Sequence, residues 1–480
     1  MLVNAAWVGG SRLVVRCLGL LSTVILARLL SPEDFGLVAV STAIIALVQG
    51  LTPVSFQPAL IYYNTLDEED YSTAWTLSML RGLVLGMTVA LAAPVLANIA
   101  DDPRTQSIAL VLALLPVISG AENPRFVDYQ KALRFGEVFR LETTTKFAGV
   151  AVSIGTAIVF QSYWALIAGM FATHITRTLL TFVLAPRPSS LSVSRWKKLL
   201  QFSGWVAAGR ALNVLSVRLQ PIILGAYLDV QVVGTFHMAR ELTANMLEEL
   251  APTLRRVLFP TMSSLERGSN AYRFAYRQSI AGLTMIIIPL AAGLALVAPH
   301  VVPLLLGAQW MDAIFPLQLF ALTLVVAAPG QLGASAAMAA GKTRFMFIRA
   351  AIVTPVQLTA FVLGTMKFGL LGAVGGSILG LLVAAWVTMT LGARFAGLSL
   401  LEHYSVSWRS WLALAAMTLW HAAVAPRISS LPSVLALLVA VSSCAAVYTG
   451  LHLLLWCSAG RPVGPESALV NAVRIRSRAA

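Results

Sequence analysis

Long apolar segments with almost no charge dominate the sequence and leave few folds open to the chain. A helix that crosses a membrane needs about 20 consecutive apolar residues, and fourteen segments of about that length follow one another here. Only 11% of the residues are charged, against roughly 25% in soluble domains. We therefore predict an all-α polytopic membrane protein with about 14 transmembrane helices. The predicted helices cover residues 5–28, 36–56, 76–99, 105–121, 142–160, 163–185, 202–227, 233–252, 279–300, 313–338, 346–366, 369–392, 409–425 and 431–457.

The basic residues are distributed unevenly between the two ends of these helices. If the N-terminus is cytoplasmic, 23 of the 34 Lys and Arg residues lie on the inner side, seven lie within helices and four lie outside. Cytoplasmic loops of membrane proteins carry such an excess. The acidic run Asp67–Asp70 is an exception on the inner side, but acidic residues contribute little to orientation. We therefore expect both termini in the cytoplasm, and we attribute the net charge of +14 to membrane topology rather than to nucleic acid binding.

The chain also contains a weak internal repeat. Trp7–Arg12 (WVGGSR) is similar to Trp205–Arg210 (WVAAGR) at an offset of 198 residues, and Gly36 aligns with Gly234 at the same offset. Two copies with an even number of helices run parallel to each other. We predict an N-terminal six-helix lobe over residues 1–198 and a second six-helix lobe over residues 199–396. An appended helix pair with a basic cytoplasmic tail would occupy residues 397–480.

One segment carries a family resemblance. Leu26–Gly36, with the sequence LARLLSPEDFG, resembles the signature of bacterial Wzx-type flippases. These are the O-antigen and exopolysaccharide exporters of the multidrug/oligosaccharidyl-lipid/polysaccharide superfamily. The shorter segments Ala340–Arg344 and Tyr163–Leu166 fit the same family, and the similarity spans residues 5–395.

The resemblance implies a fold and a function. Twelve helices would form two lobes around a central cavity that opens alternately to either membrane face. The substrates would be undecaprenyl-diphosphate-linked oligosaccharides, moved from the cytoplasmic to the periplasmic leaflet of the bacterial inner membrane for lipopolysaccharide or exopolysaccharide assembly. A polysaccharide polymerase and a chain-length regulator are the expected protein partners, and no enzymatic activity is implied. Two additional helices, as in the lipid II flippases, leave the substrate subclass open.

Basic side chains within the predicted helices are the candidate site residues. An ionised side chain near the bilayer centre costs about 2.5–3.5 kcal/mol, so it normally faces protein or water. Arg12 and Arg16 share one helix face because they are four residues apart, and Arg210 is the repeat-mate of Arg12. Arginine binds phosphate through two parallel hydrogen bonds and stays protonated. We therefore predict that a substrate cavity binds the diphosphate through Arg12, Arg16, Arg210, Arg218 and Arg240.

An alternative interpretation of these residues is structural. The arginines could instead pair with acidic residues or extend to the membrane surface, and Lys146 and Arg177 are close enough to the inner surface to do so. Glu241 and Glu248 are expected to share one helix face. They are candidates for ion coupling through a raised pKa, or for counter-ions to the cavity arginines.

Other functions fit the sequence less well. A cation-coupled drug antiporter of the same superfamily would need carboxylates in its cavity, whereas the excess within the helices is basic. A membrane polysaccharide polymerase or ligase usually carries a sizeable outer loop, and the outer loops here are short. Gly341–Thr343 does not complete a phosphate-binding loop, because Ala336 stands where its first glycine belongs. The chain has no zinc-ligand or nucleophile-elbow spacing, so we expect no metal and no cofactor. A transport-inactive scaffold for other assembly proteins stays open.

Overall fold

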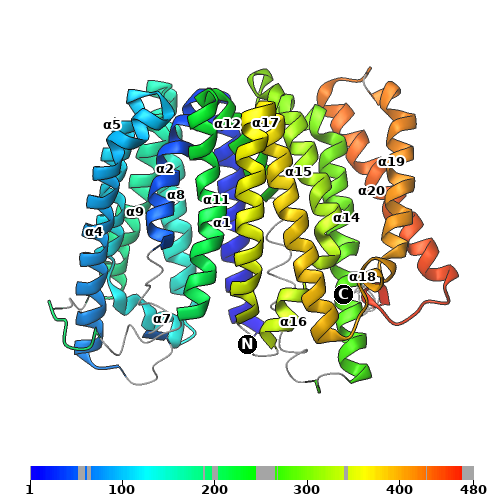
Figure 1. Ribbon diagram of the computed structural model, residues 1–480, viewed down its shortest axis with the longest axis horizontal. Helices are drawn as coiled ribbons and strands as arrows, with labels where there is room; N and C mark the ends of the chain where they lie inside the picture. Colours follow the sequence, from blue (N-terminus) through cyan, green and yellow to red (C-terminus); the bar gives the residue numbers. More distant parts are fainter. Residues whose placement is uncertain are drawn as a thin grey trace. The chain divides into compact units, whose positions relative to one another are not determined.

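The structure is a computed structural model (Figure 1). It describes residues 2–51, 60–61, 66–186, 190–196, 204–244, 265–266, 269–339, 344–428 and 430–467. Within these ranges it describes every side chain except those of residues 2–9, 11–13, 51, 204–210, 335, 338 and 339.

The described residues form helices and connecting turns, without a strand. The first part of the chain contains α1 (Leu2–Leu29), α2 (Pro32–Leu51), α4 (Glu68–Ala100), α5 (Pro103–Leu112), α6 (Leu114–Gly120), η1 (Pro124–Phe126), α7 (Val127–Lys131), α8 (Phe135–Phe160), α9 (Trp164–Leu184), α11 (Gly204–Tyr227) and α12 (Val230–Thr243). The second part contains α14 (Asn270–Leu305), η3 (Ala308–Ala313), α15 (Ile314–Ala327), η4 (Ala328–Gly330), α16 (Gly333–Ala339), α17 (Arg344–Ala396), α18 (Leu400–Ser405), α19 (Trp408–Ile428) and α20 (Ser433–Ser458).

These helices confirm the predicted class, an all-α polytopic membrane protein. Each of the fourteen predicted segments overlaps a helix of the described residues. Nine helices in the described ranges are long and apolar enough to cross a membrane. One of these, α17, contains two predicted segments, because Gly369 (φ 56°, ψ −134°) interrupts its helical geometry between them. The count of fourteen crossings stays a prediction.

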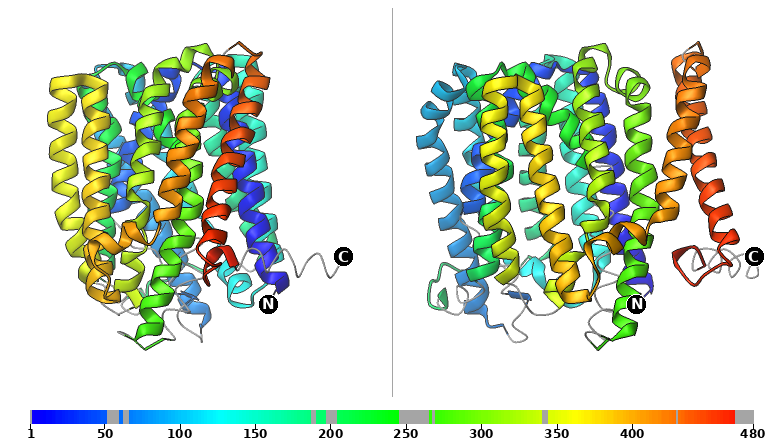
Figure 2. Two further views of the ribbon diagram at one scale, coloured as in Figure 1. Left: turned by 90° about the vertical axis from the view of Figure 1, so that its right-hand side faces the viewer. Right: turned by 45° about the vertical axis from the view of Figure 1, so that its right-hand side comes forward.

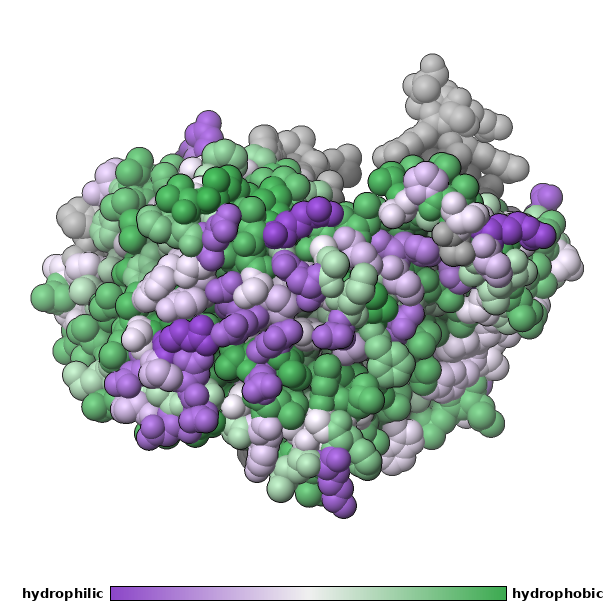
Figure 3. Space-filling view, turned by 90° about the horizontal axis from the view of Figure 1, so that it is seen from above, coloured by the Kyte–Doolittle hydropathy of each residue, from purple (hydrophilic) through white to green (hydrophobic). Residues whose placement is uncertain are grey.

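Large apolar side chains cover the outside of many helices. Leu91 on α4, Phe160 on α8 and Leu419 on α19 are each about 70% exposed. A soluble monomer rarely exposes extended apolar surface, whereas lipid accepts it. Hydrophilic side chains gather instead on the end face that is seen from above in Figure 3, with apolar side chains around them. This distribution fits helices that are surrounded by lipid along their length.

The chain divides into two compact units, Met1–His237 and Met238–Ala480. In the first unit α8 packs against both α9 and α1, α2 packs against α11, and α4 packs against α5 and α6. In the second unit α14 packs against α15, α19 and α20, and α17 packs against α15 and α16. The paired helices α19 and α20 lie beside α14 in both views of Figure 2. The expected lobe limits, residues 1–198, 199–396 and 397–480, stay predictions.

A close contact between α2 and α12 involves two residues that the repeat aligns. A methyl group at Gly36 would lie 1.9 Å from the carbonyl oxygen of Val230, and one at Gly234 would lie 1.8 Å from that of Pro32. Pro32 and Val230 are also 198 residues apart, so the contact is reciprocal. Such reciprocity is expected at a local two-fold axis between related segments. Both glycines are needed because no side chain fits at either position.

Candidate functional site

Three of the predicted arginines have described side chains. Arg16 is half-buried on α1, Arg218 is exposed on α11, and Arg240 is half-buried near the end of α12. Arg12 and Arg210 lie on α1 and α11, but their side chains are outside the described set. The structure therefore shows which helices carry the five arginines. The binding of one diphosphate by their side chains stays a prediction.

The two acidic candidates are only partly described. Glu241 is half-buried next to Arg240 on α12. Glu248 lies outside the described residues, so the predicted shared face with Glu241 stays untested.

The other two basic residues within predicted helices, Lys146 and Arg177, contact their neighbours. Lys146 on α8 has its Nζ 3.7 Å from where a Cβ of Gly19 would lie, and Arg177 forms an ion pair in the cavity described next.

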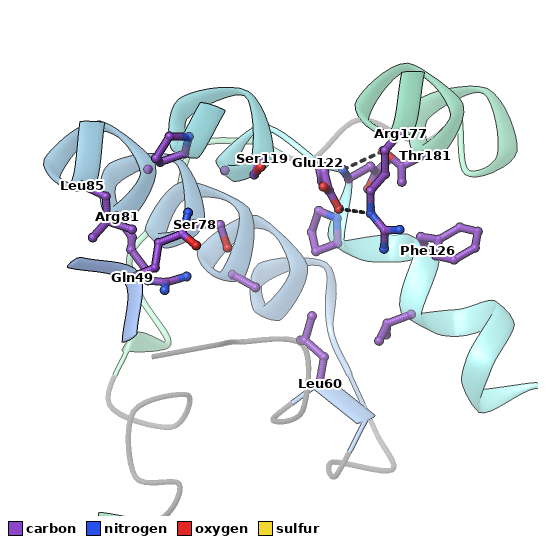
Figure 4. A pocket seen from close by; sticks show the side chains of 17 residues that line it. Gln49, Leu60, Ser78, Arg81, Leu85, Ser119, Glu122, Phe126, Arg177 and Thr181 are labelled. Carbon is purple, nitrogen blue, oxygen red and sulfur yellow. Dashed lines mark hydrogen bonds and ion pairs between the residues drawn. The ribbon is translucent and has the colours of Figure 1, made fainter. Parts of the chain in front are cut away.

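The first unit contains a polar cavity of about 200 Å³ (Figure 4). Ser78 and Arg81 line it from α4, and Arg177 and Thr181 line it from α9. Glu122, which follows α6, completes its charged wall. Charged side chains within otherwise apolar helices normally face protein or water, and here they face this cavity. We call it the N-unit cavity.

Close helix packing places the charged residues of the N-unit cavity. A methyl group at Gly82 on α4 would lie 2.4 Å from the carbonyl oxygen of Pro116, and one at Gly120 on α6 would lie 2.5 Å from that of Ser78. The two helices can therefore approach only because both positions lack a side chain. This approach brings Arg81 on α4 and Glu122 beyond α6 to the same cavity.

Hydrogen bonds hold the opposite wall of the cavity. Arg177 Nε donates to Glu122 Oε2 over 3.0 Å, and this ion pair joins α9 to the end of α6. The backbone N–H of Asn123 donates to Thr181 Oγ1 over 3.1 Å, and its side-chain amide donates to the carbonyl oxygen of Ala185. Glu122 thus sits at a helix end that is held by hydrogen bonds to α9 and to Ala185, the residue just after α9.

A second polar cluster supports the segment that follows this wall. Arg125 pairs with Glu68 at the start of α4, and its guanidinium lies 4.7 Å from the ring centroid of Tyr71. The Tyr71 hydroxyl donates to Asp128 Oδ1 on α7 over 2.5 Å. These contacts tie η1 and α7 to α4, so the segment behind Glu122 is held in place.

Sequence reasoning missed part of this cavity. It counted Arg81 among the 23 basic residues of the inner side, although residue 81 falls near the start of the helix predicted over residues 76–99. In the structure α4 begins earlier, at Glu68. It did not name Glu122 at all, and it expected Arg177 to extend to the membrane surface. One signal in the sequence could have predicted this cavity. Three charged residues lie toward the cytoplasmic ends of the predicted helices: Arg81, Glu122 and Arg177.

The family-like segment Leu26–Gly36 has a structural role in the first unit. Ser31 and Asp34 cap the start of α2 through reciprocal hydrogen bonds. Asp34 Oδ1 also accepts the backbone N–H of Tyr163, 3.0 Å away, at the start of α9. Glu33 pairs with Arg104 on α5. Together with Gly36 beside α12, these contacts join the segment, which ends α1 and begins α2, to α5, α9 and α12.

Taken together, the apolar helix exteriors, the charged cavity within the helices and the helical architecture define a polytopic membrane protein of the transporter type. Over 96% of this chain and 100% of the other, the fold is similar to that of the lipid II flippase MurJ in an inward closed conformation, with a TM-score of 0.76 and 12% identity. The family described as polysaccharide biosynthesis protein matches residues 25–315. Because this match covers more than half of the chain, the protein belongs to that family.

Two curated relatives have similar sequences. The lipopolysaccharide biosynthesis protein WzxC of Escherichia coli (strain K12) is 25% identical over 380 residues, which are 78% of this chain and 77% of the relative. The succinoglycan biosynthesis transport protein ExoT of Rhizobium meliloti (strain 1021) is 21% identical over 329 residues, which are 68% of this chain and 66% of the relative. These comparisons confirm the predicted family.

Proposed function

We propose that this protein moves undecaprenyl-diphosphate-linked oligosaccharide units from the cytoplasmic to the periplasmic leaflet of the bacterial inner membrane. The observation that carries the proposal is the flippase-like fold over nearly the whole chain, in a member of a polysaccharide biosynthesis family. The names of WzxC and ExoT place those relatives in lipopolysaccharide synthesis and succinoglycan transport. The step makes and breaks no covalent bond, so the protein acts as a transporter, and a polymerase and a chain-length regulator would act after it.

The proposal includes a site for the diphosphate. Arg12 and Arg16 on α1 and Arg210 and Arg218 on α11 would bind it, with Arg240 on α12 as a further contact. Support comes from the apolar character of α1 and α11, because a guanidinium within such a helix is costly unless it has a polar partner. Glu241 and Glu248 would act as counter-ions to these arginines or couple transport to an ion gradient.

A deletion strain tests the activity. Loss of the gene should leave the lipid-linked repeat unit in the cytoplasmic leaflet, where a membrane-impermeant oxidant or lectin cannot reach it in spheroplasts. Accumulation of single unpolymerised units in the periplasmic leaflet would contradict the proposal, because it would indicate a missing polymerase instead.

Single substitutions test the diphosphate site. Arg16→Ala and Arg210→Ala should each abolish polysaccharide export while the protein stays folded and inserted, because each removes a phosphate-binding fork. Export is measured in the complemented deletion strain and protein level by immunoblot. Arg140→Ala is the matched control, since this side chain is 72% exposed and its one ion pair with a described residue is the 3.4 Å contact with Glu137. Normal export by both site variants would refute the arginine site.

A further inference from the structure

The long helix α17 (Arg344–Ala396) folds back on itself at Gly369, so that its two halves run side by side (Figure 2). A methyl group at Gly364 would lie 2.3 Å from the carbonyl oxygen of Gly372, and one at Gly372 would lie 1.9 Å from that of Gly364. The 53 residues of α17 give two halves that are each about 37 Å long, slightly more than the roughly 30 Å of hydrocarbon in a bilayer. Both ends of α17 therefore lie at the same membrane surface, which is the cytoplasmic one in the predicted topology.

The same dipeptide, Arg-Phe, stands at both ends of α17. Phe345 and Phe395 are in edge-to-face contact, with ring centroids 5.4 Å apart. The guanidinium carbon of Arg394 lies 5.1 Å from the centroid of the Phe345 ring. Arg344 and Arg394 each precede one of these two rings in the sequence, so both arginines flank the same ring pair. We call them the α17 arginine pair.

The described residues supply no carboxylate to the α17 arginine pair. α17 itself contains no acidic residue. The helices α14, α15, α16 and α18 pack against it, and their sequences contain one acidic residue, Glu402 on α18. Glu402 already pairs with Arg273 over 2.8 Å and with Arg277 over 3.2 Å. Among the described residues neither Arg344 nor Arg394 forms an ion pair, and the ring contact is the one interaction of Arg394.

Both arginines are exposed at the ends of helix faces that present apolar side chains. Trp386 lies eight residues before Arg394, and Ile352 lies eight residues after Arg344. Residues eight apart share a helix face, and these two apolar side chains are 56% and 45% exposed. Faces of this kind suit contact with lipid tails, and an arginine at the end of such a helix extends to the level of the headgroups.

We propose that the α17 arginine pair binds the phosphate of an anionic phospholipid in the leaflet at this end of the helix. Guanidinium groups bind phosphate through parallel hydrogen bonds, and basic sites between membrane helices bind anionic headgroups. The Phe345 ring holds the Arg394 guanidinium by a cation–π contact, which leaves the N–H donors in the guanidinium plane for the phosphate. The site is separate from the proposed diphosphate site on α1, α11 and α12, and it does not depend on the flippase function.

Native mass spectrometry of the purified full-length chain tests the site. The probes are dioleoyl phosphatidylglycerol, which has a net negative charge, and dioleoyl phosphatidylcholine, which has the same phosphate but no net charge. The unchanged protein should bind phosphatidylglycerol about tenfold more tightly than phosphatidylcholine. The double variant Arg344→Gln/Arg394→Gln should weaken the binding of the first phosphatidylglycerol about tenfold, because it removes both guanidiniums.

Arg427→Gln is the matched control for this experiment. Arg427 is also an exposed arginine of the second unit, in the last turn of α19, and among the described residues it has neither an ion pair nor a ring contact. Its variant should bind phosphatidylglycerol as the unchanged protein does. The apparent Tm of each variant without added lipid shows that it is folded. Phosphatidylglycerol should raise the Tm of the unchanged protein more than that of the double variant, because a ligand stabilises the state that binds it.

A variant that preserves charge separates a built site from general attraction. Arg344→Lys/Arg394→Lys keeps both positive charges but lacks the planar fork that binds phosphate. It should bind phosphatidylglycerol about threefold or more weakly than the unchanged protein. Equal binding by the two proteins would overturn the proposal, since charge alone would then be sufficient.

Three further results would overturn the proposal. Equal binding of phosphatidylglycerol by the unchanged protein and the glutamine double variant would place the lipid elsewhere. An equal loss in Arg427→Gln would indicate attraction to surface charge in general. Displacement of phosphatidylglycerol by undecaprenyl diphosphate at a much lower concentration would assign the pair to the diphosphate of a transported lipid. The assay does not measure export, so the lipid site and the proposed flippase function can each fail without the other.

Discussion

At the scale of single residues, several functional-looking positions turn out to be structural. Ser31, Glu33, Asp34 and Gly36 form part of the segment that resembles the family signature, and each contacts another part of the first unit. The motif identified the family without revealing these contacts, because the partners Arg104, on α5, and Val230, on α12, are distant in sequence. A signature in a membrane protein can thus record how helices meet rather than what they bind.

The α2–α12 contact gives a first prediction. Gly36→Ala should lower the apparent Tm, because the new methyl group would lie 1.9 Å from the Val230 carbonyl oxygen and overpacking costs roughly 1–3 kcal/mol. Gly155→Ala is the control, since nothing lies within 4 Å of that position on α8 and the change should stabilise a helix by roughly 0.5–1 kcal/mol. Thermal unfolding in detergent measures both. Equal Tm values for the two variants would contradict the close contact.

Glu402 gives a second prediction, on pH dependence. Its carboxylate accepts the backbone N–H of Ser399 over 2.7 Å and forms ion pairs with Arg273 and Arg277. The hydrogen bond from Ser399, followed by the one from Arg273, lowers the pKa of Glu402 below its usual value of about 4.5. A lowered pKa in the folded state contributes stability above the ordinary pKa, and this contribution is lost as the pH falls through the lowered value.

The measurement compares Glu402→Gln with the unchanged protein. At pH 7 the variant should have the lower apparent Tm, and the difference should shrink as the pH falls below about 4.5. A difference that is constant from pH 7 to pH 3 would show that the charge of Glu402 does not stabilise the fold.

At the scale of helices, hydropathy predicts which segments are apolar enough to cross the membrane, but it does not predict the residue at which each helix begins. The acidic run Asp67–Asp70 was expected in a loop, yet Asp67 and Asp70 form a capping box at the start of α4. Acidic side chains in a first turn stabilise a helix through its dipole, so polar residues extend this helix beyond its apolar stretch. Ser269 caps α14 with its hydroxyl, which accepts the backbone N–H of Tyr272, and the helix begins at Asn270, nine residues before the expected start at residue 279.

The uncertainty in where helices begin also limited the prediction of the residues that line the N-unit cavity. Isolated basic residues in apolar runs identified Arg16 and Arg218 as candidates, because such a charge stands out in a hydropathy pattern. Arg81 did not stand out, since the uncertain helix start placed it at the membrane surface. The pairing of Arg177 with Glu122 depends on the packing of α9 against α6, which no local pattern records.

The C-terminal helix pair gives a third prediction. Glu466, only 4% exposed, accepts from Arg409 at the start of α19 over 2.5 Å and lies 3.2 Å from His452 Nε2 on α20. Removal of one partner from a buried ion pair costs about 3–5 kcal/mol. Glu466→Gln should therefore loosen the segment after α20 and make it more sensitive to limited proteolysis.

Glu137→Gln is the matched control for this experiment. It also removes a carboxylate that pairs with an arginine, but that arginine, Arg140, is 72% exposed. Pairs of this kind contribute about 0–1 kcal/mol, so the control should be cleaved at the rate of the unchanged protein. Equal cleavage of both variants would contradict a structural role for the buried pair.

At the scale of the whole molecule, composition and charge distribution predict the class and an orientation. The class is confirmed by the helices, their apolar exteriors and the family match. Orientation is a separate physical question, because a helical bundle would look the same if it were inserted either way. It depends on the 23 inner and four outer basic residues of the predicted topology, and an experiment on intact cells can test it.

Cysteine labelling in spheroplasts provides that experiment. The exposed Cys17 and Cys457 are first replaced by serine. Single cysteines are then introduced by Asp229→Cys between α11 and α12, and by Ala132→Cys just after α7, both at exposed positions. A membrane-impermeant maleimide should label the first and reach the second only after lysis, because the positive-inside bias predicts that the basic loops lie in the cytoplasm. The opposite pattern would reverse the topology, and with it the direction in which the proposed flippase presents its substrate to the periplasm.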